Sequence, residues 1–153
     1  MLREHLSNRL KQAMKDKEAR VVSTVRLILT AIKDRDIAAR GKGNAEGISD
    51  QDIGQVLQTM VRQCDEAIAL YQQGGREELA RQEAEEIDVI RGFLPRQLDE
   101  AELTLAVQAV LGEIGAGGIK DMGRTMAVLK ERYSGQMDFT KASAAVKAEL
   151  TGG

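Results

Sequence analysis

The chain has 153 residues, of which 42% are hydrophobic, enough for one domain of ordinary size or two small ones with packed cores. Aromatic residues make up only 3% and Trp is absent, so the cores must consist of aliphatic side chains, which suit helix interiors better than half-buried sheets. One Cys excludes an internal disulfide framework, and a formal net charge of −2 disfavours general binding to nucleic acid. This composition predicts an all-α protein in a reducing compartment.

The first 17 residues, MLREHLSNRLKQAMKDK, carry charges throughout and contain no continuous apolar run. They fit neither a secretion signal nor a membrane span, so we expect a cytoplasmic protein with no membrane partner. Leu2, Leu6, Leu10 and Met14 recur at every fourth position of this segment. Their spacing predicts a first amphipathic helix.

Three more helices are expected before residue 95. Apolar residues keep a helical period in residues 21–32, 53–71 and 79–94. The charged run 15–18 separates the first helix from the second, and the glycine-rich run 41–48, GKGNAEGI, separates the second from the third.

Local signals mark where several helices begin and end. Ser49 and Asp99 are predicted N-caps. Asp52, three residues after Ser49, resembles the acidic half of a capping box, and the Asp99 cap is followed by an acidic first turn with Glu100 and Glu102. The pair 74–75 is Gly-Gly, which readily adopts the left-handed conformation that ends a helix.

Pro95 is the only proline. It lacks a backbone donor and restricts Leu94, so the fourth helix must end there. We therefore predict an N-terminal helical domain at 1–94, a hinge at Pro95, and a C-terminal domain at 95–153. In the second domain, apolar periods predict three helices at 103–114, 122–133 and 139–150.

The run GGIKDMGRTM at 117–126 invites two interpretations: a phosphate cradle at a helix start, or a connection between helices. Gly117 and Gly118 are predicted to end one helix and Asp121 to cap the next, where its carboxylate would repel an anion. Gly123 would let a neighbouring helix or a ligand approach the backbone. These roles favour a connection, and the absence of a Walker A motif argues against a nucleotide cofactor.

No group of residues indicates catalysis. His5 is the only histidine and lies in the first helical turn, and Cys64 lies on an apolar stripe where a thiol behaves as a small hydrophobe. Glu83 and Glu86 share a helix face, but acid runs of this kind usually form solvated surfaces. We therefore predict no catalytic residue, no metal and no cofactor.

Basic residues are concentrated in residues 1–42, which hold eleven Lys/Arg and five Asp/Glu, a net charge of +6. They form a candidate surface for a nucleic-acid backbone. A solvated face, or one paired with acids such as those of the fourth helix, is the favoured interpretation. The cations considered are Lys11, Lys15, Lys17, Arg20, Lys33, Arg35, Arg40 and Lys42.

Two longer segments carry a family resemblance: AEEIDVIRGFLPRQLDEAEL, and IGAGGIKDMGRTMAVLKERYSG followed by a last helix. With the preceding helical half they resemble the YqeY family over nearly the entire chain, and FLPRQL and DMGRTM…LKERYSG are the most specific parts. The resemblance implies a C-terminal part similar to the tail of GatB, a subunit of the amidotransferase that corrects mischarged Glu-tRNA or Asp-tRNA.

In GatB that tail is helical and contacts tRNA, so the resemblance implies tRNA, or a protein of tRNA-dependent amidation or translation, as a partner. It also implies an association with carbon–nitrogen ligase activity using glutamine as amide donor. This sequence lacks the catalytic cradle of GatB that binds ATP and Mg²⁺, so we expect a non-catalytic module. The candidate RNA-binding residues are Lys120, Arg124, Lys130, Arg132, Lys141 and Lys147. Residues 117–147 contain these six basic residues and three acids, a net charge of +3.

Two other hypotheses remain at this stage. The protein could be a helical interaction module with no nucleic-acid role, which would use the Pro95 hinge and the dipolar N-terminal half to grip another protein. A weaker hypothesis is an auxiliary enzymatic role within an amidotransferase.

Overall fold

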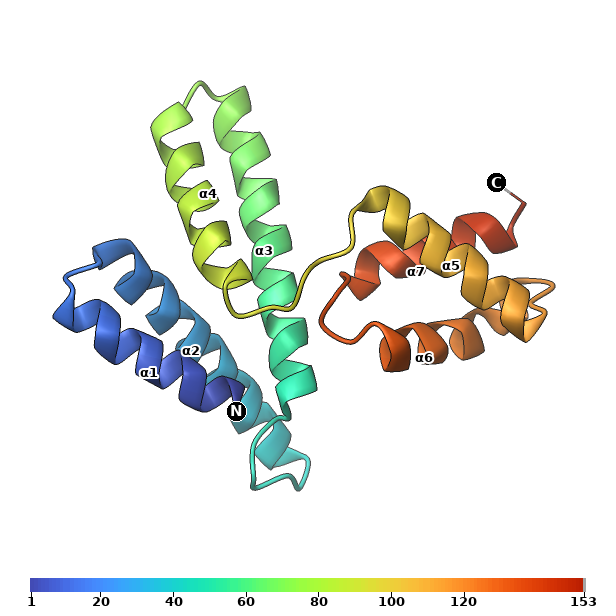
Figure 1. The fold of residues 1–153 in the computed structure, drawn as a ribbon, viewed down its shortest axis with the longest axis horizontal. Coiled ribbons are helices and arrows are strands. Elements are labelled where there is room, and N and C mark those ends of the chain that lie inside the picture. Colours follow the sequence, from blue (N-terminus) through green and yellow to red (C-terminus); the bar gives the residue numbers. More distant parts are fainter. Residues whose placement is uncertain (153) are drawn as a thin grey trace. The chain divides into compact units, whose positions relative to one another are not determined.

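The computed structural model describes residues 1–152, and within them it contains seven α-helices and one short 3₁₀ helix, with no strand (Figure 1). The all-α prediction is confirmed. The chain divides into two compact units, Met1–Pro95 and Arg96–Gly153. A hinge motion at Pro95 stays a prediction. None of the described helices combines the length and the apolarity needed to cross a membrane.

The N-terminal unit consists of two helical hairpins. In Figure 1, α1 (Leu2–Lys15) lies against α2 (Ala19–Gly41), and α3 (Asp50–Gln73) lies against α4 (Glu77–Arg91). The apolar faces of all four helices meet in one core. Its buried members are Leu6, Val25, Ile28, Ile32, Ile53, Leu57, Val61, Cys64, Ile87, Ile90 and Phe93.

One position of the first apolar stripe differs from the prediction. Leu6 is fully buried, but the Met14 side chain is 52% exposed and Ala13 is buried in its place. Residues four apart are rotated by about 40° around a helix, so a strict spacing of four drifts away from the core. By Met14 the drift has carried the stripe onto the surface.

In the N-terminal unit, helix ends follow the predicted local signals with one correction. The Ser49 hydroxyl accepts a hydrogen bond from the Asp52 N–H, and Gly75 adopts a left-handed φ of 70° after α3. However, α4 ends at Arg91, before the predicted limit at Pro95. Residues 92–94 form tighter turns, in which the Phe93 N–H bonds to the Ile90 carbonyl and Phe93 still reaches the core. Proline therefore marks the end of this turn and not the end of the helix.

A charged contact holds the start of α1 to Asp36 of α2 and, through Ile48, to the loop before α3. The Arg3 guanidinium donates two hydrogen bonds of 2.8 Å to the Asp36 carboxylate, and the same carboxylate accepts from the Ile48 N–H at 2.9 Å. Gly47 lies beside this contact with φ +92°, and a Cβ at this position would lie 2.8 Å from the Arg3 side chain. We call Arg3, Asp36, Gly47 and Ile48 the Asp36 latch.

The C-terminal unit contains α5 (Glu100–Ile114), the 3₁₀ helix η1 (Ile119–Asp121), α6 (Met122–Arg132) and α7 (Phe139–Leu150). The three α-helices contact one another pairwise and enclose a second core. Its buried members are Leu103, Ala106, Val107, Val110, Leu129, Met137, Phe139, Ala142 and Val146.

The predicted cap of α5 forms a complete capping box. Asp99 accepts a hydrogen bond from the Glu102 N–H at 2.8 Å, and Glu102 accepts from the Asp99 N–H at 3.1 Å. Replacing Asp99 by Ala should lower the free energy of unfolding by about 1 kcal/mol, because the Glu102 N–H at the helix start loses its side-chain acceptor. Thermal unfolding should show no comparable loss for Glu100→Ala in the same turn, and equal losses would contradict the cap.

Candidate nucleic-acid interface

The connection between α5 and α6 differs from the sequence prediction in the residue that ends α5. Helix α5 ends at Ile114, and Gly115 provides the left-handed residue with φ 64°. Gly117 and Gly118 follow the helix end, and Gly118 has extended backbone with φ −179°. The prediction that Gly117 and Gly118 terminate the helix is therefore wrong. The first glycine after the last helical turn has the geometry to accept the left-handed conformation, so the later ones are free to span the loop.

Asp121 also has a different role from the predicted one. It is the residue before α6, but its side chain makes no capping hydrogen bond to the backbone N–H groups of that helix. One carboxylate oxygen accepts from the Gly117 N–H at 2.8 Å, and the other is 3.0 Å from the Arg124 guanidinium. The Gly117 hydrogen bond and the nearby Arg124 charge hold the pKa of Asp121 below its usual value. Asp121 belongs to η1, which precedes α6, and its carboxylate bonds to the preceding loop at Gly117. This hydrogen bond stabilises the loop.

Gly123 makes no close helix contact. Apart from its chain neighbours and the backbone of its own helix, no atom of the described residues lies within 4 Å of the position that its Cβ would occupy, so the predicted approach of a neighbouring helix is wrong. Approach of a ligand to this backbone stays a prediction.

Two of the six candidate RNA-binding cations are engaged in ion pairs. Arg124 pairs with Asp121 and donates to the Ile114 carbonyl at 3.2 Å. Arg132 lies 2.9 Å from Glu113, and its hydrogen bond lowers the pKa of that carboxyl. Among the described residues, the remaining four make no ion pair and are exposed: Lys120, Lys130, Lys141 and Lys147.

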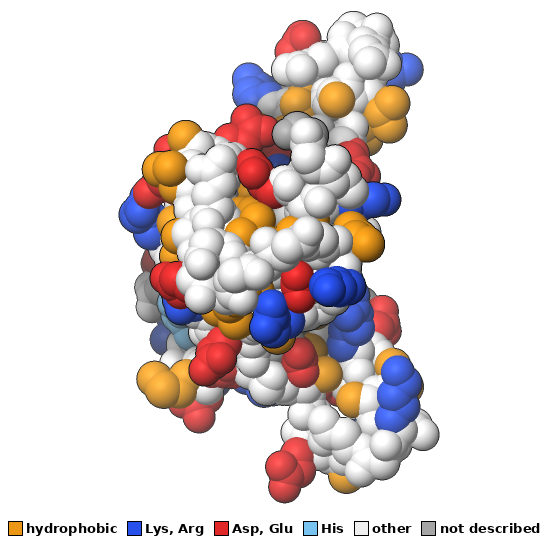
Figure 2. Space-filling view, turned by 90° about the vertical axis from the view of Figure 1, so that its right-hand side faces the viewer, with side chains coloured by type: hydrophobic (Ala, Val, Ile, Leu, Met, Phe, Trp, Pro, Cys, Tyr) orange, Lys and Arg blue, Asp and Glu red, His pale blue; other side chains and the backbone are white. Residues whose placement is uncertain are grey.

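These cations do not share one helix face. At about 100° per residue, Lys130 and Arg132 point about 160° apart around α6, and Lys141 and Lys147 point about 120° apart around α7. Figure 2 shows Lys and Arg side chains scattered among Asp and Glu on the face that it presents, with no single basic block. The structure therefore gives little support to a continuous basic surface built from the six.

Among the predicted cations of residues 1–42, Arg20 is ion-paired and the others are exposed. Arg20 lies 3.2 Å from Glu85 and 3.9 Å from Glu86 of α4, so the predicted pairing with the acidic fourth helix holds for this residue. Within residues 1–152 the other cations of the predicted set form no ion pair, and they are exposed. They are Lys11, Lys15, Lys17, Lys33, Arg35, Arg40 and Lys42.

Helix α2 aligns three of its cations. Arg26, Lys33 and Arg40 are seven residues apart, which places them in one column at intervals of about 10 Å along the helix. All three are exposed. We call these three residues the α2 column. Arg26 is absent from the predicted set of cations, although its spacing of seven from Lys33 could have identified it.

A match to a known protein family covers nearly the whole chain. The model described as Yqey-like protein matches residues 3–150. The chain belongs to the YqeY family. The search of curated proteins found no match.

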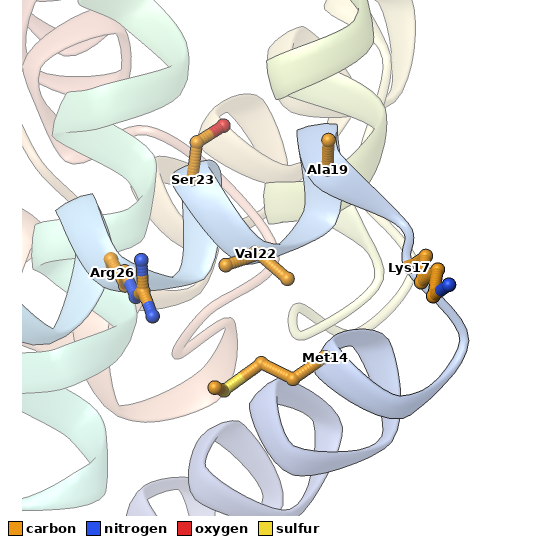
Figure 3. A pocket seen from close by; sticks show the side chains of 6 residues that line it. All are labelled: Met14, Lys17, Ala19, Val22, Ser23 and Arg26. Carbon is orange, nitrogen blue, oxygen red and sulfur yellow. The ribbon is translucent and has the colours of Figure 1, made fainter.

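Arg26, the first residue of the α2 column in this YqeY-family chain, borders an apolar hollow. Figure 3 shows Met14 of α1 extending beneath Val22 of α2, with Arg26 beside them. Lys17, Ala19 and Ser23 complete the lining of this open hollow of about 470 Å³. Positive charge and exposed apolar surface therefore occur together on this side of the first hairpin.

The residues considered for catalysis lie apart from the α2 column in the sequence. His5 packs edge-on against Phe93, with ring centroids 4.9 Å apart. Cys64 is only 7% exposed, which confirms its predicted burial, and burial raises the pKa of its thiol to about 12. A thiol with so high a pKa is a poor nucleophile near neutral pH. The Cys64 thiol lies beside the carboxylates of Glu83 and Glu86, within 4.8 Å of an oxygen of each.

Proposed function

We propose that this YqeY-family protein is a non-catalytic accessory module that binds tRNA through its phosphate backbone, in the context of tRNA-dependent amidation or translation. The α2 column is the observation that carries the proposal. It supplies three aligned, exposed cations that form no ion pair within residues 1–152, and Lys17 of the first hairpin lines the same hollow as Arg26.

Backbone recognition suits this surface better than base recognition. Lys and Arg side chains that neutralise phosphates release counterions, which favours binding irrespective of sequence. Base stacking needs aromatic side chains, and residues 1–42 contain none. The resemblance of the C-terminal part to the GatB tail makes tRNA the nucleic acid to test first. The exposed lysines of the C-terminal unit would add contacts of secondary strength.

Two charge-reversal variants with equal net charge test the proposal. One carries Arg26→Glu, Lys33→Glu and Arg40→Glu, and the other carries Lys120→Glu, Lys130→Glu and Lys147→Glu. Binding of total tRNA is measured by gel shift at several salt concentrations. The α2 variant should lose on the order of 10-fold or more in affinity at low salt, and its log–log salt slope should become shallower by about 2 to 3.

The C-terminal variant should lose less affinity, although it carries the same change in charge. An equal or larger loss in that variant would move the interface to the C-terminal unit. If the unaltered protein binds no tRNA at low salt, or binds it without salt dependence, the proposed function is wrong. Circular dichroism of both variants establishes that they remain folded.

The apolar hollow favours a second candidate function, a module that docks a helix of another protein. Met14 and Ile37 are more than half exposed and lie near the cations of the first hairpin, so an amphipathic acidic helix would complement this side. Capture experiments with and without RNase separate the candidates. Partners that survive RNase, together with no tRNA shift, would support the helix-docking function.

A further inference from the structure

The hairpin of α3 and α4 brings together two features that are distant in the sequence. Cys64 projects from α3, and Glu83 and Glu86 lie three residues apart on α4. One donor atom from each residue lies within 4.8 Å of the other two, and the Cys64 Sγ is 3.7 Å from Glu86 Oε2. The thiol is buried and both carboxylates are partly buried.

The charges of this cluster are poorly balanced. The two carboxylates are close enough to raise the pKa of Glu86, for which burial is the main cause and the Glu83 charge the next. One cation, Arg20, pairs with the cluster, and its guanidinium lies 3.9 Å from Glu86 Oε1. Glu86 therefore offers one oxygen to Arg20 and turns the other toward the thiol. Such a cluster would gain from a cation placed between its three donors.

We propose that Cys64, Glu83 and Glu86 bind one thiophilic divalent metal ion, with Zn²⁺ as the reference ion. One thiolate, one oxygen of each glutamate and a water would complete a four-coordinate site. Arg20 would hold Glu86 in position through its second oxygen, as outer partners commonly do for carboxylate ligands. This cluster differs from the expectation of no metal, since Cys64 of α3 and the two glutamates of α4 meet only in the folded hairpin.

The distances suit this ion with small adjustments. Tetrahedral zinc with one sulfur and oxygen ligands separates its donor atoms by about 3.4–3.6 Å. The present separation of 3.7 Å between Sγ and Oε2 is close to that value. Closing the widest separation of 4.8 Å requires a shift of about 1 Å, which lies within the reach of flexible glutamate side chains. A thiolate ligand favours Zn²⁺ over Mg²⁺, which prefers oxygen donors alone.

Binding has a defined proton balance. The metal–sulfur bond replaces the S–H bond of Cys64, so one thiol proton is released to solvent. Molecules in which Glu86 is protonated release a second proton from its carboxyl. No change of oxidation state is involved, because Zn²⁺ has no redox chemistry at such a site.

The test titrates the full-length reduced protein with ZnCl₂ by calorimetry and with Co²⁺ by absorption spectroscopy. One Zn²⁺ per chain should bind with release of protons, and Co²⁺ should show a thiolate-to-metal charge-transfer band in the near ultraviolet. Cys64→Ser should abolish that band, and Glu83→Gln or Glu86→Gln should each weaken Zn²⁺ binding on the order of 10- to 100-fold. MgCl₂ should not compete.

Matched controls use acids on the same helix that lie outside the cluster. Glu77→Gln and Glu78→Gln should leave Zn²⁺ affinity nearly unchanged, and His5→Ala excludes binding at the only histidine. The glutamine variants replace partly buried carboxylates with groups of the same shape, so they keep the test decisive if Cys64→Ser unfolds. Absence of stoichiometric binding, or equal affinity in Glu83→Gln, Glu86→Gln and the controls, would overturn the proposal.

Discussion

Replacing Leu129 by Ala is expected to unfold the C-terminal unit. Leu129 is fully buried in α6 and belongs to the only core described for that unit. Truncating a buried Leu to Ala costs about 3–5 kcal/mol, because apolar contacts are lost and a cavity remains. A unit of this size has a marginal reserve of stability, so a loss of this magnitude should exceed it. Hydrogen exchange of the α5 to α7 amides should accelerate strongly.

Leu105→Ala is the matched control. Leu105 lies on α5 of the same unit but is 65% exposed, so its truncation should change the stability by less than about 0.5 kcal/mol. Tyr133 and Phe139, the aromatic residues of this unit, provide ring signals in NMR spectra that report loss of packing directly. Similar exchange rates in the two variants would show that α6 does not depend on this core as described.

Replacing Asp36 by Ala should have the second largest effect, because it removes the centre of the Asp36 latch. The change leaves the Arg3 guanidinium and the Ile48 N–H without their shared acceptor. The Arg3 and Asp36 side chains are both partly open to solvent, which limits the expected loss to about 1–2 kcal/mol in the free energy of unfolding. Asp34→Ala, on an exposed position of the same helix without an ion pair, should lower it much less. Chemical denaturation of both variants measures the difference.

The Asp36 latch should also depend on pH. Hydrogen bonds from Arg3 and from the Ile48 N–H lower the pKa of Asp36 to about 2. The unfolded chain, with an ordinary Asp pKa of about 3.9, then binds protons more readily than the folded chain as the pH falls. The stabilisation is therefore complete above about pH 4 and is lost between about pH 4 and 2. The stability difference between the unaltered protein and Asp36→Asn should shrink over this range, and a constant difference would contradict the role of the charge.

Local sequence signals were sufficient for most of the helical architecture. The caps at Ser49 and Asp99 formed as predicted, because each depends on a side chain and a backbone group only three residues away. Helical periods gave the seven helices for the same reason. Where several residues could serve one local role, the prediction failed: any of the glycines at 115, 117 and 118 can adopt a left-handed conformation, and the final turn of α5 selected Gly115.

The sequence by itself therefore determined the fold class, the helices and their caps, since these depend on neighbours along the chain. Tertiary structure alone decided which charged groups meet. The rotation and packing of whole helices placed Asp36 against Arg3, removed Arg132 from the candidate RNA surface by pairing it with Glu113, and joined Cys64 to the glutamates of α4. Electrostatic and ligand contacts extend only a few ångströms, so a modest rotation of one helix makes or breaks them. No periodicity in the sequence specifies that rotation.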